Sequence, residues 1–351
     1  MKLSQYFSIL VVILLPVVST CKENVGNKKG HGMIKIESCE TRGKRKGIGK
    51  SCKVQKSNSS ESLGVLLTYD FFEVEVPGNK RIGFEKKELG GRTSPEGGGP
   101  PSWHGQSGPS TFNLVLRNKL AVGSFVVDNM VYQITAREET DTMTVVRKLS
   151  SDFPPEADVI IDEEGSQRKM LLPGTQEVHE NETDTFHNAF HDRQLRDFYT
   201  IDILVAWTPK AECNSAGLDD SCWQTNSTRA LMEALIELSV LETNIAYLES
   251  GVNAQLRLVH MYPVNYTETG VESALAHLRK EDDGNMDEIH GLREIYGADM
   301  VALIVSSELY CGIGSFGPRR DKMFSVTNWD CATGYYTFGH ELGHNQVCYV
   351  L

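Results

Sequence analysis

The segment YTIDILVAW, Tyr199 to Trp207, decides the fold of the C-terminal half of this 351-residue chain. Its apolar run ends at Thr208-Pro209, which is typical of a buried strand. The next segment, 228–248, repeats apolar residues at helical spacing. The alternation then continues, with strands expected at 254–261 and 299–305, helices at 271–280 and 286–296, and an edge strand at 323–327. Strands that alternate with helices predict an α/β fold with helices packed on a sheet.

The N-terminal half has a different pattern. Phe112, Leu114 and Leu116 alternate with polar neighbours, Asn118-Lys119 follows them, and 120–135 is rich in β-branched and aromatic residues. Period-two apolar runs separated by turn residues predict a small antiparallel β domain at 62–150. A loop rich in Gly, Pro and Ser at 90–110 interrupts it.

Two polar segments flank this β domain. Residues 21–61 are basic and poor in apolar residues, which predicts a flexible arm, with a polyanion-binding segment as the alternative. Residues 151–198 are acidic and polar and predict a linker open to proteolytic processing. His187 and His191 stand four apart in that linker, without a third ligand or general base nearby, so we interpret them as solvated.

The N-terminus predicts export. Lys2 precedes an apolar run from Tyr6 to Val18, and small residues follow before Cys21, so residues 1–20 are interpreted as a signal peptide, with an uncleaved anchor as the alternative. No later stretch has about 18 apolar residues, so no further membrane span is expected. A secreted chain can carry N-glycans. The sequons lie at Asn58, Asn181, Asn226 and Asn265.

The charge is unevenly distributed. Residues 1–197 hold 26 Lys and Arg against 26 Asp and Glu, whereas 198–351 hold 9 against 21, so the whole net charge of −12 belongs to the C-terminal part. Nucleic-acid binding needs clustered cations, so no nucleic-acid partner is expected there. A 40% apolar content excludes global disorder.

The sequence HELGHN at 340–345 carries the chemistry. His340 and His344 are four apart, so on a helix their side chains lie on one face about 6 Å apart and can bind one zinc ion. Glu341 can take a proton from an activated water and pass it to a leaving amine. This is the HExxH pattern of metal-dependent peptide hydrolysis, with two unrelated helical histidines as the alternative.

HELGHN resembles the start of the metzincin signature HExxHxxGxxH, in the reprolysin-like group of secreted metalloendopeptidases. The resemblance extends upstream through Asp202–Val205, Thr208-Pro209, Glu242–Asn244, Ser250–Val252, Met286–Glu288, Tyr296–Asp299, Cys311-Gly312 and Cys331-Ala332. It implies a metzincin-like catalytic domain at 199–351 with a twisted mixed sheet, Zn²⁺ as cofactor, and protein or peptide substrates. It also implies His340 and His344 as zinc ligands and Glu341 as general base. The β domain resembles the family's propeptide more loosely, which implies a zymogen inhibited by its own propeptide.

The chain departs from the family pattern after Asn345. The third ligand would fall at position 350 and a glycine at 347, where this chain has Val350 and Val347. Two histidines alone would bind zinc weakly. Cys348 would lie about 12 Å from His340 along the helix axis, too far to share the ion. We therefore expect the catalytic domain to be incomplete at its C-terminus.

Two explanations remain open for this departure. Gln346-Val347 is compatible with a splice donor, so the first is an incomplete gene model. The second is a genuinely truncated protein. The corresponding alternative function is an inactive secreted protease remnant that acts as a binding or inhibitory protein.

The cysteines predict local disulfides in an exported chain. Cys213 and Cys222 flank one polar loop, and Cys311 and Cys331 flank another before the HELGHN segment. Cys39 and Cys52 either pair with each other or provide an inhibitory thiolate for the zinc, since thiolate is a soft ligand that suits this ion.

Overall fold

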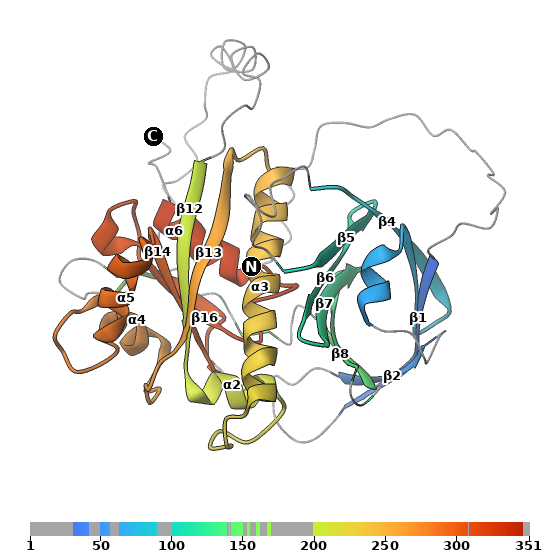
Figure 1. Cartoon of the computed structure of the whole chain (residues 1–351), viewed down its shortest axis with the longest axis horizontal. Coiled ribbons are helices and arrows are strands. Elements are labelled where there is room, and N and C mark those ends of the chain that lie inside the picture. The colour runs from blue at the N-terminus through green and yellow to red at the C-terminus, as the bar shows by residue number, and fades with distance from the viewer. Residues whose placement is uncertain are drawn as a thin grey trace, which may run out of the picture.

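The computed structural model describes residues 31–41, 50–56, 63–89, 100–138, 140, 142–149, 153–154, 159–161, 167–169, 199–307 and 309–346. Figure 1 shows two parts side by side: a β-barrel formed by residues 31–149 and an α/β part formed by residues 199–346. A short hairpin of β10 (Val159–Ile161) and β11 (Gln167–Lys169) lies between them in sequence. The predicted division into a β-rich half and an α/β half therefore describes the architecture.

The barrel closes in the strand order β1-β2-β9-β8-β7-β6-β5-β4-β3. Alternating apolar residues point inward, and Phe72, Trp103 and Phe112 form an edge-to-face and tilted aromatic cluster at its centre, with centroids 4.9 to 5.3 Å apart. The predicted turn at Asn118-Lys119 forms, with both residues at positive φ, as a tight hairpin requires. The strands are β1 (His31–Thr41), β2 (Lys50–Lys56), β3 (Phe71–Val76), β4 (Lys80–Lys86), β5 (Ser102–Ser107), β6 (Ser110–Arg117), β7 (Leu120–Val127), β8 (Met130–Arg137) and β9 (Thr142–Leu149), with a 3₁₀ helix at Leu63–Thr68.

The barrel starts earlier than the sequence predicted, so the expected flexible arm at 21–61 is wrong for β1 and β2. Ile34 and Ile36 alternate with polar residues and are buried inside the barrel, a short signal that the surrounding basic residues obscured. β1 also pairs with β3 in parallel, so the barrel is not purely antiparallel. A disulfide joins Cys39 to Cys52 across β1 and β2. These two cysteines therefore pair with each other, and neither supplies a thiolate for zinc.

The α/β part has one sheet in the order β13-β12-β14-β16-β15. All its neighbouring strands are parallel except β15 and β16, which makes the sheet mixed. Residues 323–327 were predicted as an edge strand, but β16 lies inside the sheet, because the three-residue strand β15 covers its outer side. The strands are β12 (Tyr199–Trp207), β13 (Ala254–Pro263), β14 (Met300–Val305), β15 (Gly312–Gly314) and β16 (Phe324–Asn328).

Helices cover both faces of this sheet. Two apolar clusters lie on its opposite faces: α4 and α5 contribute to one, and α3 and α6 to the other. Helix α2 was not predicted; Thr208 caps it by accepting the Ala211 N–H at 3.1 Å, and Pro209 occupies the first turn. No helix among the described residues is long and apolar enough to cross a membrane. The helices are α2 (Pro209–Ser215), α3 (Asn226–Glu249), α4 (Val271–Arg279), α5 (Glu288–Tyr296) and α6 (Thr337–Gln346), with a 3₁₀ turn at Arg320–Lys322.

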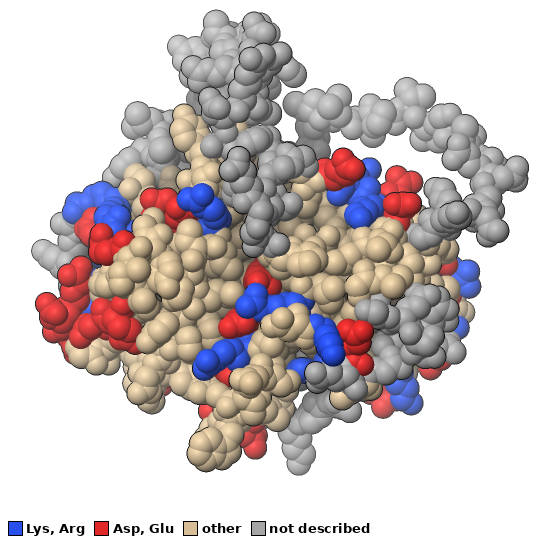
Figure 2. All heavy atoms as spheres, in the orientation of Figure 1, with Lys and Arg blue, Asp and Glu red and all other residues tan. Residues whose placement is uncertain are grey.

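Acidic and basic side chains gather at different places on the surface. Figure 2 shows Asp and Glu side chains gathered beside the α4 and α5 region, where the connecting loop contains Glu281, Asp282, Asp283 and Asp287. Lys and Arg side chains gather in front of the boundary between the barrel and α3. At that boundary Arg117 of the barrel pairs with Glu233 and Glu237 of α3.

Glu242 of α3 lies buried where the two parts meet. Its carboxylate accepts hydrogen bonds from Ser124 and Asn113 of the barrel and from the Gly334 N–H of the α/β part. Burial raises the pKa of Glu242 to about 7 from an ordinary 4.5, although these three hydrogen bonds act in the opposite direction.

This raised pKa makes stability depend on pH. Between pH 4.5 and 7 the folded chain holds a proton on Glu242 that the unfolded chain has lost, so the free energy of unfolding falls as the pH rises through this window and levels off above it. We expect the free energy of unfolding, measured with urea, to fall between pH 5 and pH 8 in the wild type. In Glu242→Gln this fall should be smaller by on the order of 2 kcal/mol. The exposed Glu85→Gln is the control and should follow the wild type. An unchanged pH dependence in Glu242→Gln would contradict this assignment.

Candidate active site

Helix α6 is held by its apolar side. Phe338 and Leu342 are four residues apart and fully buried in the cluster that also contains α3 and the sheet. Because residues four apart share a helix face, His340 and His344 lie together on a different face, where both side chains are partly accessible. The prediction that HELGHN lies on a helix is therefore confirmed.

The two histidines and Glu341 lie close together. The imidazole centroids of His340 and His344 are 4.8 Å apart with the rings nearly perpendicular. The Glu341 carboxylate oxygen lies 3.9 Å from Nε2 of His344, and the side chain is 1% exposed. One buried carboxylate thus adjoins two imidazoles, which is the arrangement expected for two metal ligands and a general base.

Glycines of β15 allow α6 to approach the sheet. A Cβ at Gly312 would lie 2.6 Å from a carboxylate oxygen of Glu341. A Cβ at Gly314 would lie 2.5 Å from the backbone oxygen of Glu341 and 3.1 Å from Cβ of His344. Glycine at these positions therefore sets the distance between the edge strand and the candidate catalytic turn.

A matched pair of glycine substitutions tests this packing. Gly314→Ala should cost about 1–3 kcal/mol of unfolding free energy, because its methyl group meets backbone that cannot rotate away. Gly343→Ala lies in α6 itself, where an added Cβ would have no atom within 4 Å, and should gain roughly 0.5–1 kcal/mol through helix propensity. Urea unfolding measures both. Equal effects in the two variants would show that β15 tolerates a side chain at this contact.

The C-terminal turn of α6 is fixed by contacts that the sequence did not reveal. The buried Asn345 amide nitrogen donates to the carbonyls of Ser315, Lys322 and Phe324 at 2.6 to 3.1 Å. The Gly317 N–H donates to the His344 carbonyl at 3.0 Å. In the sequence, the signal for this role was only that Asn345 directly follows His344. The partners of Asn345 lie more than 20 residues away along the chain. These bonds hold His344 in place relative to the loop after β15.

The donor set fits two positions of a zinc site. Neutral imidazoles are common zinc ligands, and the ring separation lets both reach one ion. No group of three or more His, Cys, Asp or Glu side chains that could hold a metal occurs among the residues that the structure describes. The expectations for Val347, Cys348 and Val350, and for the C-terminus, fall on residues 347–351, outside the described residues.

Some of the other predicted residues lie in the part of the chain that the structure describes, and others do not. Cys213 pairs with Cys222 and Cys311 with Cys331, as the loop positions predicted. Asn226 and Asn265 are exposed, which is what a glycan would need. The signal peptide, Asn58, Asn181, His187 and His191 lie outside the part of the chain that the structure describes.

Comparisons with known proteins find similarity to metallopeptidases. A family model described as metallo-peptidase family M12B, reprolysin-like, matches residues 232–348. The peptidyl-Asp metalloendopeptidase of Stenotrophomonas maltophilia (strain K279a) is 40% identical over 117 residues, covering 33% of this chain and 28% of that protein. The protein of the same name from Pseudomonas aeruginosa (strain PAO1) is 32% identical over 166 residues, covering 42% and 24%. The chain thus spans about a quarter of the length of these relatives.

A solved structure is similar only loosely. The crystal structure of metalloproteinase-II from Bacteroides fragilis covers 78% of this chain and 79% of its own, with 10% identity and a TM-score of 0.37. The family model, by contrast, matches a segment that runs from within α3 to α6 and includes His340, Glu341 and His344. Residues 232–348 of this chain are therefore similar to the reprolysin-like metallopeptidases.

Proposed function

We propose that this chain is a secreted, zinc-dependent metalloendopeptidase made as a zymogen. The observation that carries the proposal is the placement of His340, Glu341 and His344 on α6, inside the segment that matches the reprolysin-like family. Residues 1–20 would direct export. The barrel and the segment after it would form the propeptide.

Each of the three side chains has a separate role in this proposal. His340 and His344 would hold the zinc ion through their imidazole nitrogens. Bound zinc supplies Lewis-acid chemistry, making water a better nucleophile and polarising the scissile carbonyl. Glu341 would accept the proton of the attacking water and deliver it to the leaving amine. Its burial against β15 keeps its carboxylate beside the histidine pair.

The edge strand β15 offers a place for an extended peptide. Among the strands that the structure describes, β15 forms its sheet hydrogen bonds only with β16, so its other side offers backbone groups for strand addition. The hairpin strand β10 lies against β15. This contact supports self-inhibition, in which the chain's own segment after the barrel occupies the position of a substrate until processing.

We infer a substrate preference from the names of the relatives and from the charges of one loop. The relatives are named peptidyl-Asp metalloendopeptidases, and we infer that this chain also cleaves peptides at aspartate. In an otherwise acidic half, the loop that contacts the end of α6 carries the exposed Arg319 and Arg320, which pair with Asp321 and Glu294 and could exchange these partners for an acidic peptide.

Metal content and hydrolysis test the proposal together. Protein equilibrated with excess zinc, which offsets the weak binding expected of two histidines, should bind the ion, and it should cleave an aspartate-containing peptide in a reaction that a chelator stops and added zinc restores. The same peptide with asparagine in place of aspartate is the matched substrate control. A folded protein that takes up no zinc and leaves the peptide intact would overturn the proposal in favour of a non-catalytic binding protein.

A further inference from the structure

An apolar strip on α3 forms part of the contact between the barrel and the α/β part. Its members are buried against Val115, Leu120 and Val122 of β6 and β7. Separation of the two parts would expose this strip to water, which is unfavourable in proportion to its area. The α3 residues of the strip are Leu231, Ala234, Leu238, Leu241 and Ile245. Figure 1 shows α3 lying between the barrel and the sheet along most of its length.

Polar bonds at the buried Glu242 join three elements at one point. Ser124 of β7 and Asn113 of β6 donate to one carboxylate oxygen, while the Gly334 N–H donates to the other at 2.7 Å. A buried carboxylate needs such donors, and here two of the three come from the barrel. The barrel therefore completes the hydrogen bonding of an α3 side chain.

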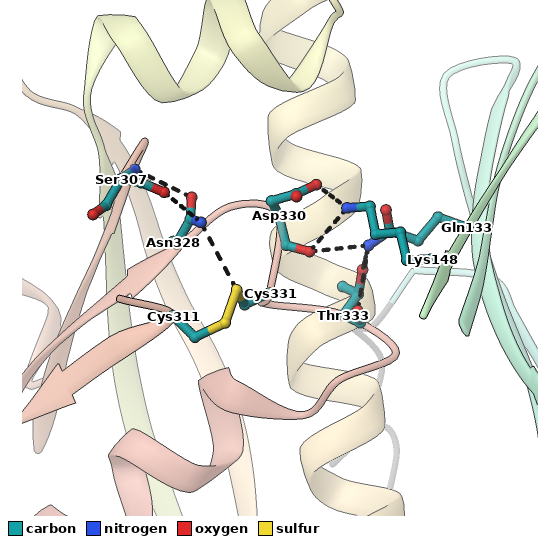
Figure 3. Close-up of polar contacts among 8 residues, drawn as sticks. All are labelled: Gln133, Lys148, Ser307, Cys311, Asn328, Asp330, Cys331 and Thr333. Carbon is teal, nitrogen blue, oxygen red and sulfur yellow. Dashed lines mark hydrogen bonds and ion pairs between the residues drawn. A yellow bond between two sulfur atoms is a disulfide. The ribbon is translucent and has the colours of Figure 1, made fainter. Parts of the chain in front are cut away.

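A second contact holds the segment Asp330–Tyr336, which leads directly into α6. Figure 3 shows Lys148 and Gln133 of the barrel reaching toward this segment. Lys148, only 2% exposed, forms an ion pair with Asp330, and Gln133 donates to the carbonyls of Asp330 and Thr333. Phe153, just after the barrel, stacks on Tyr335 at 4.3 Å. The Cys311–Cys331 disulfide lies in the same cluster.

The backbone of Asp330–Tyr336 is shaped to fit the barrel. Gly334 has a φ of +72°, and a Cβ there would lie 2.5 Å from Val131 of β8. Tyr336 has a φ of +64°, uncommon for a bulky residue, and its hydroxyl lies 3.2 Å from Thr111 of β6. Both conformations occur within the three residues before Thr337, the first residue of α6.

We propose that the barrel is a docking module that stays bound to α3 and Asp330–Tyr336 after the chain between the two parts is cut. None of the three disulfides among the described residues joins the two parts, so the contact itself consists of the apolar strip, the hydrogen bonds and the ion pair described above. The kind of partner that this surface fits is thus a detached barrel of the same sequence, and binding sets the backbone just before the histidine helix. The proposal does not depend on peptidase activity.

The test uses the full chain with a site-specific protease sequence placed within residues 171–198, outside the described residues. After complete cutting, confirmed on a non-reducing gel, the two pieces should co-elute in size-exclusion chromatography down to about 1 µM. Leu238→Asp in the apolar strip should weaken this association at least tenfold. The exposed α3 residue Arg229 gives the control, and Arg229→Ala should co-elute like the wild type.

A variant on the barrel side keeps the test decisive. If Leu238→Asp does not fold, as judged by circular dichroism, Val122→Asp places the same charge on the opposite surface of the contact. Wild-type pieces that separate at about 10 µM would overturn the proposal. Pieces that carry either aspartate, fold, and still associate as tightly as the wild type would show that the docking surface lies elsewhere.

Discussion

Glu341→Gln is expected to lower peptide hydrolysis by about 10³-fold, within the range that a general base contributes. Glutamine has nearly the same shape but cannot accept the proton of the attacking water. The buried position against Gly312 should accommodate the amide, because its volume is almost unchanged. Initial rates on an aspartate-containing peptide, measured on zinc-loaded protein, give the comparison.

The loss must be separated from loss of metal. Glu341→Gln retains His340 and His344, so its zinc content should match that of the wild type. Glu288→Gln, at an exposed position of α5, is the matched control and should keep the full rate. A Glu341→Gln protein that binds zinc and hydrolyses the peptide within tenfold of the wild type would exclude Glu341 as the general base.

Asp330→Asn is expected to lower the free energy of unfolding by about 3 kcal/mol. The partner Lys148 is 2% exposed, so removal of the Asp330 charge leaves a buried ammonium without its counter-ion. The Asp330 backbone oxygen at 3.3 Å and the rings of Phe153 and Trp329 remain as partial compensation. Urea unfolding gives the measurement.

The barrel contains an exposed pair with the same two residue types. Lys80 and Asp128 have side chains 51% and 56% exposed, so Asp128→Asn should cost less than about 1 kcal/mol. Asparagine also suits the positive φ of 51° at this position, which removes backbone strain as a cause. Equal losses in the two variants would mean that burial of Lys148 does not make its ion pair more important than one on the surface.

Much of the α/β part could be predicted from the chain because its periodicity is strong. The runs around 199–207 and 299–305 are continuously apolar, and 228–248 repeats at helical spacing, so strands and helix formed where expected. β1 and β2 were missed because only two or three apolar residues alternate within a basic context. β16 was placed at the edge because the three residues Gly312–Gly314 are too short to signal a strand of their own.

The sequence by itself determined the chemical identity of the site. Two histidines and a glutamate within five residues lie on neighbouring positions of one helix whenever that helix forms, because helix geometry is local. The same locality explains why the disulfides within 213–222 and 311–331 were predictable. The expected charge imbalance likewise needed no structure.

Only the tertiary structure decided how this helix is held. Three contacts join residues that are 21 to 129 positions apart in the sequence. They are the packing of α6 on the glycines of β15, the hydrogen bonds of Asn345 to three carbonyls, and the hydrogen bonds of Glu242 with Ser124, Asn113 and Gly334. Such contacts depend on which surfaces pack together, and no periodicity in a single segment encodes that choice. The barrel's position on α3 and Asp330–Tyr336 is of this kind, since burial of apolar and charged groups across two parts exists only once both have folded.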